Sequence, residues 1–213
     1  MTFPYPILHR TELIQQMNNS GKSKSPFFFI VDFMAQNGYL IKYQDLDDRY
    51  IRFQLSDESV SNLEKSSQQP FDIQWDIYPI NFKKYRLKFN SVMENIHCGN
   101  SYLLNLTQPT MVNTNLNLLE LYGLSVSKYK LWLKDLFTVF SPETFIKIED
   151  GRISTFPMKG TINASIENAE QTILNDIKEQ AEHATIVDLL RNDLSRVAEK
   201  VEVKKYRYID KIF

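Results

Sequence analysis

Short runs of hydrophobic residues, separated by polar turn-forming residues, mark the N-terminal part of the chain. The runs "FFFIVDF" (27–33), "GYLIKY" (38–43) and "YIRFQL" (50–55) are rich in aromatic and β-branched residues, which is typical of strands. We expect them to form a meander. The polar stretch "SDESVSNLEKSSQQPF" (56–71) follows, and it predicts a loop that is the best candidate for a domain boundary.

Helical spacing appears next, in a segment that ends at a turn. Its apolar positions are Tyr85, Phe89, Val92, Met93 and Ile96, and "CGN" at 98–100 predicts the end of the helix. A strand is predicted at "SYLLNLT" (101–107) and a helix at 118–131. Antiparallel strands are predicted at "FTVF" (137–140), "TFIKIED" (144–150) and "RISTFPM" (152–158), because Asp-Gly between the last two suits a tight hairpin turn.

The last third of the chain has a helical pattern over 165–197, interrupted at Asn175 and Asp176. Asp176 is expected to cap the second of the two helices. The tail "VEVKKYRYIDKI" (201–212) is strand-like. Strands therefore come in groups with helices inserted between them. This order predicts an α+β fold of antiparallel sheets with helices on the outside.

Composition narrows the functional classes. The net charge is −1 and no basic run stands out, so nothing points to nucleic acid. No apolar run approaches the roughly 20 residues of a membrane span, and the N-terminus lacks the pattern of a signal peptide. The single cysteine, Cys98, excludes internal disulfides and a cysteine-based zinc site. We expect a cytoplasmic protein whose core includes Trp75, Trp132 and Tyr85.

The heptapeptide "FPMKGTI" (156–162) places a lysine beside a Gly-Thr pair. It is not a phosphate-binding loop, because the lysine precedes the glycine and no glycine run lies upstream. In an apolar setting Lys159 would offer a neutral amine as nucleophile or base. Gly160 lets a ligand approach the backbone, and Thr161 offers a hydroxyl and an amide to a carboxylate. From these residues alone, a lysine that snorkels from a strand end is the favoured interpretation.

Two glutamates lie three positions apart on the predicted helix 176–193. Glu179 and Glu182 would be neighbours on one face, and the same stripe continues through Ile186, Leu189 and Asp193. Two like charges are costly unless a cation neutralises them, and carboxylate oxygens suit Mg²⁺. The alternatives stay open: Asp176 and Glu179 also match a capping box, and Glu182 can be a solvated surface residue. Arg191 and Asp193 are expected to pair at the helix end.

Taken together, four segments resemble the chorismate-utilising enzymes in their order and spacing. They are "GNSYLLNLT" (99–107), "SPETFIKIEDGRISTFPMKGTI" (141–162), "KEQAEHATIVDLLRNDLSRVA" (178–198) and "VEVKKYRYID" (201–210). Within the family, they are most similar to the branch of aminodeoxychorismate synthase component I, the para-aminobenzoate branch of folate biosynthesis.

The resemblance implies a two-sheet fold of the anthranilate synthase type, with an N-terminal region at 1–80 and an incomplete catalytic domain at 81–213. It implies that Glu179 and Glu182 bind Mg²⁺, that Gly160 and Thr161 hold a carboxylate of chorismate, and that Lys159 is a covalent nucleophile. Ammonia would come from a glutamine amidotransferase subunit. The family's catalytic domain is expected to continue beyond these 213 residues. An anthranilate synthase-like enzyme and a non-catalytic binding module are the alternatives.

Overall fold

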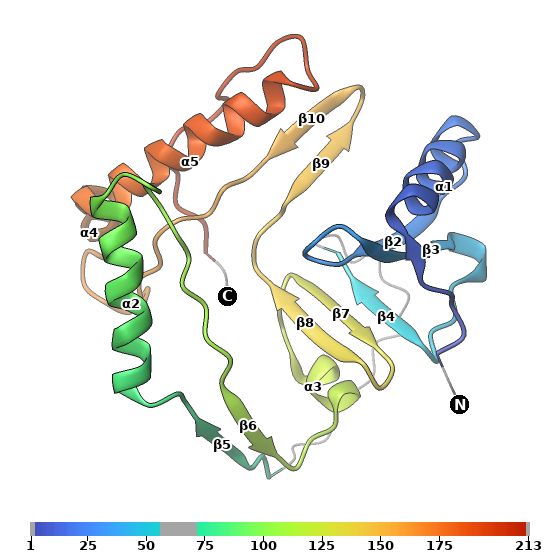
Figure 1. Cartoon of the computed structure of the whole chain (residues 1–213), viewed down its shortest axis with the longest axis horizontal. Coiled ribbons are helices and arrows are strands. Elements are labelled where there is room, and N and C mark those ends of the chain that lie inside the picture. The colour runs from blue at the N-terminus through green and yellow to red at the C-terminus, as the bar shows by residue number, and fades with distance from the viewer. Residues whose placement is uncertain (1–2, 56–71, 212–213) are drawn as a thin grey trace. The chain divides into compact units, whose positions relative to one another are not determined.

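The computed structural model describes residues 3–55 and 72–211, and Figure 1 labels their helices and strands. The chain divides into two compact units. Unit 1 comprises Met1–Gln69 and Leu118–Ser141, and unit 2 comprises Pro70–Asn117 and Pro142–Phe213. The stretch 56–71, which the sequence predicts to be a loop and a boundary, lies outside the described residues.

A three-stranded antiparallel sheet and one helix form the first part of unit 1. The sheet has the order β1-β3-β2, built from β1 (Leu8–His9), β2 (Phe27–Val31) and β3 (Asn37–Lys42). Helix α1 (Arg10–Lys22) contacts β3. The sequence pattern predicts β2 and β3 correctly. It misses α1, whose apolar side chains are too few to reveal the helical period, and only Leu13 of this helix is buried.

The second sheet of unit 1 joins distant parts of the chain. Strand β4 (Ile51–Gln54) pairs antiparallel with β7 (Tyr129–Leu133), which pairs in turn with β8 (Phe137–Ser141). The predicted meander is therefore wrong at its third strand, since β4 belongs to this sheet (Figure 1). Helix α3 (Leu118–Leu124) contacts β7 and β8. It is shorter than the predicted helix 118–131, whose last residues instead belong to β7.

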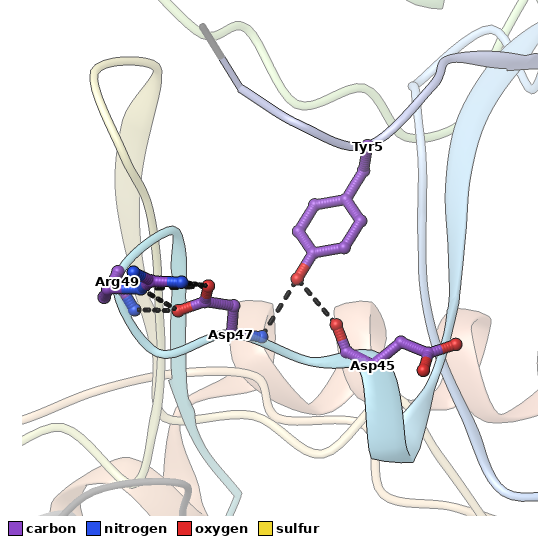
Figure 2. Close-up of polar contacts among 4 residues, drawn as sticks. All are labelled: Tyr5, Asp45, Asp47 and Arg49. Atoms are coloured by element: carbon purple, nitrogen blue, oxygen red, sulfur yellow. Dashed lines mark hydrogen bonds and ion pairs between the residues drawn. The ribbon is translucent and has the colours of Figure 1, made fainter. Parts of the chain in front are cut away.

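The buried core of unit 1 lies where β3, β4 and β7 meet. Ile41, Ile51, Phe53 and Leu133 form one buried cluster. A tyrosine beside this core holds the turn that leads into β4 (Figure 2). The Tyr5 hydroxyl donates to the carbonyl oxygen of Asp45 and accepts from the amide of Asp47, both at 2.9 Å. The Asp47 carboxylate pairs with the Arg49 guanidinium, whose hydrogen bonds lower the pKa of Asp47.

Unit 2 begins with two strands and a helix. Strand β5 (Trp75–Tyr78) pairs antiparallel with β6 (Met111–Thr114). Helix α2 (Phe82–His97) starts at Asn81, whose side chain accepts from the Lys83 amide at 2.8 Å. This helix confirms the predicted segment and its end before Cys98. The predicted strand at 101–107 is wrong, because these residues form no strand and β6 lies farther along the chain.

The remaining elements of unit 2 carry the candidate site. Strands β9 (Ile146–Glu149) and β10 (Arg152–Thr155) form the predicted hairpin. Its turn residues Asp150 and Gly151 have φ values of 50° and 72°, which fits a tight primed turn. Helices α4 (Ala169–Asn175) and α5 (Ile177–Ser195) then follow, separated at Asp176 as predicted. The predicted strand in the tail is wrong over 201–210, where the chain forms no strand.

These elements make an α+β fold of antiparallel sheets, as predicted. Within the described ranges, no helix is long and apolar enough to cross a membrane. The three aromatic residues expected in the core differ in outcome. Trp132 is buried, whereas Trp75 on β5 is 48% exposed, so its prediction is wrong. Tyr85 is half-buried and stacks on Phe89. The division of the sequence at residue 80 stays a prediction.

Candidate functional site

The first two turns of α5 carry the two candidate metal ligands. Asp176 caps the helix, since its side chain accepts from the Glu179 amide at 3.0 Å. The cap fixes where the helix begins and therefore places Glu179 in its first turn and Glu182 in its second. Both side chains are largely covered, with exposed fractions of 21% and 29%. The cap confirms half of the predicted capping box, while the Glu179 carboxylate makes other contacts.

A lysine links the two carboxylates. The Nζ atom of Lys178 lies 2.9 Å from Oε1 of Glu182 and 3.1 Å from Oε1 of Glu179. Hydrogen bonds to Glu182 and Glu179, in that order of size, raise the pKa of Lys178 to about 12. The lysine is therefore charged at neutral pH, and one cation is in contact with both carboxylates.

The second contact of Glu179 is with the Lys-Gly-Thr turn. Gly160 has a φ of 72°, in the left-handed region that favours glycine. A Cβ atom added there would lie 2.8 Å from Oε2 of Glu179 and 3.1 Å from Cδ1 of Ile173. Such a methyl group would collide with the carboxylate. Gly160 thus lies directly against Glu179, and two segments that the sequence singled out separately are brought together.

Lys159 and Thr161 flank this glycine, and both are exposed. Neither side chain makes a hydrogen bond or ion pair to another described residue. The exposed side chain agrees with the favoured interpretation of a lysine that snorkels, and it does not supply the apolar setting that a neutral amine would need. The turn is anchored on its N-terminal side, because the Met158 amide donates to Oε1 of Glu143 at 3.2 Å. The backbone is thus held at the residue before Lys159, whose side chain is exposed.

Residues distant in sequence support the junction of α4 and α5. The carbonyl oxygen of Leu174 accepts from Nε2 of Gln180 at 2.8 Å and from Nη2 of Arg207. The His183 ring packs edge-on against Tyr206 at 5.3 Å between ring centroids. Burial lowers the pKa of His183, and the nearby Arg207 charge lowers it further. Sequence reasoning missed Arg207, because no local pattern links it to Leu174.

One prediction for the far end of α5 needs correction. Arg191 pairs with Asp188 at 3.8 Å on the helix surface, rather than with Asp193. An i,i+3 partner lies on the same face, whereas i,i+2 does not. Leu189, which continues the stripe of Glu179 and Glu182, is 52% exposed.

The donor set of the site fits a hard divalent cation. Two carboxylates that contact one nitrogen atom are spaced to contact one metal ion, and Mg²⁺ commonly takes one or two protein carboxylates with water or substrate oxygens completing its shell. No cluster of three or more His, Cys, Asp or Glu side chains suited to a metal occurs in residues 3–55 and 72–211. Glu179 and Glu182 are thus a pair that leaves several positions on such an ion open.

Comparison with known proteins identifies the family. The family model described as chorismate binding enzyme matches residues 5–212. This chain belongs to the chorismate binding enzymes. An uncharacterised PabA-like protein of Haemophilus influenzae is 44% identical over 199 residues, which cover 93% of this chain and 60% of that protein. No solved structure matches the chain.

Named enzymes of the family are more distant or match a shorter stretch. Aminodeoxychorismate synthase component 1 of Salmonella typhimurium is 31% identical over 190 residues, covering 82% of this chain and 40% of that enzyme. Anthranilate synthase component 1 of Methanothermobacter marburgensis is 45% identical over 76 residues, covering 32% and 16%. This member of the chorismate binding enzymes therefore spans at most about three fifths of the length of these relatives.

Proposed function

We propose that this chain carries the nucleophile and part of the substrate site of an aminodeoxychorismate synthase, which converts chorismate and ammonia to 4-amino-4-deoxychorismate. The packing of Gly160 against Glu179 is the main support, because it holds the Lys-Gly-Thr turn beside a carboxylate pair. Membership of the chorismate binding enzymes supports the substrate class. Similarity to aminodeoxychorismate synthase component 1 over most of the chain supports the branch.

Lys159 is the nucleophile in this proposal. Its amine forms a bond to C2 of chorismate while the 4-hydroxyl group leaves, and the proton lost by the amine balances the proton that converts hydroxide to water. Ammonia then forms a bond to C4 and loses a proton, and the Lys159 nitrogen takes up a proton as its bond to C2 breaks and it leaves as a free amine. The Lys159 side chain is exposed and unpaired among the described residues, so a substrate can reach it. The net reaction exchanges the 4-hydroxyl group for an amino group and releases water.

The neighbouring residues bind and orient the substrate. Gly160 and Thr161 offer backbone amides and a hydroxyl to a carboxylate of chorismate, while Glu179 and Glu182 hold Mg²⁺. When bound, Mg²⁺ would supply Lewis-acid stabilisation and a template for the ring carboxylate. Ammonia would be delivered by a separate glutamine amidotransferase subunit, and an ammonium salt can replace that subunit in an assay.

Anthranilate synthesis is the second candidate. The local identity with anthranilate synthase component 1, at 45% over 76 residues, favours it. The two functions differ in their use of Lys159, because the resemblance implies a small neutral residue at this position in the anthranilate branch. The reaction product and the activity of Lys159 variants therefore distinguish the two functions.

The test is to capture the covalent step. The chain is incubated with chorismate and Mg²⁺ but without ammonia, and its peptides are analysed by mass spectrometry. We expect an adduct of chorismate, less one water, on Lys159. Lys159→Ala should abolish the adduct, whereas Lys204→Ala, which removes an exposed lysine paired with Glu202, should not. Adding an ammonium salt should then release 4-amino-4-deoxychorismate.

Other outcomes overturn the proposal in distinct ways. Anthranilate production that survives Lys159→Ala supports the second candidate. Chorismate binding without an adduct supports a binding module. An adduct on a different lysine refutes the role of Lys159.

A further inference from the structure

Lys178 lies against both members of the carboxylate pair. It precedes Glu179 in the chain, and its Nζ atom lies within 3.1 Å of one oxygen of Glu179 and of Glu182. The second oxygen of Glu179 faces Gly160. The chain itself thus places a cation where the carboxylates of α5 converge.

One ammonium leaves this pair incompletely neutralised. Two carboxylates three residues apart on a helix repel each other, and a single positive charge leaves a net charge of −1. A divalent ion would balance both carboxylates. It also needs its oxygens at about 2.0–2.1 Å, so it cannot share the same oxygens with the ammonium without bringing two positive charges together. Lys178 and the metal ion therefore compete.

The side chain of Lys178 can move away from the carboxylates. Its side chain is 71% exposed, so the ammonium can move into solvent and recover its hydration. Ion pairs of exposed lysines are weak, because water screens them and the long side chain loses freedom. A doubly charged ion at the same oxygens has the stronger electrostatic attraction.

We infer that Lys178 is an internal counter-ion of the carboxylate pair, which a divalent metal must displace and which thereby weakens binding of the free metal. This inference rests on the proposed function, since it concerns the metal site assigned there. Lys178 weakens binding of the metal ion when no substrate is bound. Additional oxygens from a substrate carboxylate would offset it, so metal and substrate are expected to bind more tightly together than either does alone.

Binding of Mn²⁺, followed by the loss of its free-ion electron paramagnetic resonance signal, tests the inference without measuring catalysis. Lys178→Gln should bind Mn²⁺ about tenfold more tightly than the wild type, because one competing charge is removed. Lys178→Arg keeps the charge and should bind like the wild type. Lys204→Gln is the matched control, since Lys204 is 73% exposed and pairs at 2.7 Å with Glu202 away from Glu179, and it should leave the affinity unchanged.

The outcomes separate the inference from the proposed function. Tighter Mn²⁺ binding by Lys178→Gln supports both the counter-ion and the metal site, if the gain is lost again when Glu182→Gln is added. Unchanged or weaker binding by Lys178→Gln, while Glu182→Gln still abolishes binding in the wild type, overturns the counter-ion and leaves the metal site standing. Binding that is insensitive to Glu182→Gln overturns the metal site and the counter-ion together. A matching gain in Lys204→Gln would show a general charge effect and would also overturn the inference.

Discussion

The two units of the chain bury their apolar residues very differently. Of the buried hydrophobic residues in the described ranges, all but Ala169 belong to unit 1, and Ile41, Ile51, Phe53 and Leu133 form one cluster there. In unit 2, every residue of β5 and of β9 is exposed. Yet unit 2 holds Lys159, Gly160, Glu179 and Glu182. The core and the candidate chemistry thus lie in different units.

This difference shows what holds each unit together. Unit 1 depends on burial of side chains brought together from distant parts of the chain, which is the main stabilising contribution in folded domains. The site in unit 2 is held by polar and backbone features, among them the Asp176 cap, the positive φ of Gly160 and the ion pairs of Lys178. We therefore expect core mutations to change the stability of unit 1, and mutations of caps and turns to change the local geometry of unit 2.

The largest difference in stability is expected between alanine variants of two leucines, one in each unit. Leu133 of unit 1 is 0% exposed, whereas Leu189 of unit 2 is 52% exposed. Leu133→Ala should lower the free energy of unfolding by about 2–5 kcal/mol, because it removes buried contacts and leaves a cavity. Leu189→Ala should change it by less than about 0.5 kcal/mol. Urea denaturation followed by circular dichroism measures both, and equal losses would remove the distinction between the units.

Gly160 provides the next test, with a second glycine as its control. Gly160 and Gly99 have φ values of 72° and 74°, but a Cβ atom would meet Glu179 only at Gly160 and has open space at Gly99. Gly99→Ala should cost about 1 kcal/mol from backbone strain alone. Gly160→Ala should cost roughly 1 kcal/mol more, because the carboxylate must also move. Chemical denaturation of both variants gives the difference, and similar costs would mean that Glu179 moves away freely.

A buried hydroxyl in unit 1 gives a smaller effect of opposite sign. Tyr122 is 1% exposed, and its hydroxyl has no hydrogen-bond partner among the described residues. Tyr122→Phe should stabilise the protein by about 1 kcal/mol, because it removes an unsatisfied polar group. Thermal unfolding at pH 7 measures this gain, and a clear loss of stability would indicate that the hydroxyl has a partner in solution.

The same substitution should change the response to alkaline pH. Burial raises the pKa of Tyr122 to about 12 from its ordinary 10.0, although Arg52 opposes the shift. The folded state therefore holds this proton more tightly than the unfolded state. The pH-dependent contribution of Tyr122 to the free energy of unfolding is fully present below pH 10 and is lost as the pH rises through 12. Tyr122→Phe should lose less stability than the wild type over this range, and parallel curves would contradict the shift.

Local signals made parts of the fold predictable. Asp-Gly at 150–151 identified the hairpin of β9 and β10, and Asp176 identified the break between α4 and α5, because a turn and a cap depend on a few adjacent residues. The predictions failed where a strand depends on a pairing partner far away in the sequence. The runs at 101–107 and 201–210 have strand-like composition but form no strand. Conversely, part of the predicted helix 118–131 became β7, because β4 pairs with it from far away in the sequence.

Part of the candidate site could also be predicted from the sequence. The spacing of Glu179 and Glu182 placed both on one helix face, and the i,i+4 spacing of Lys178 and Glu182 could have identified their ion pair. The contact of Gly160 with Glu179 could not be derived from spacing, because it depends on how the turn lies against α5. Family resemblance linked these residues before the structure placed them in contact.

The smallest effect is expected from two helix caps in unit 2, and it tests whether the cap of α5 serves the site. Asp176 accepts from the Glu179 amide at 3.0 Å and Asn81 from the Lys83 amide at 2.8 Å, so either change to alanine should cost about 1 kcal/mol. Only Asp176→Ala should also weaken Mn²⁺ binding, because fraying of the first turn displaces Glu179. Urea denaturation and Mn²⁺ titration of both variants separate the two effects. Equal Mn²⁺ affinity in both would mean that the carboxylate pair keeps its position without the cap.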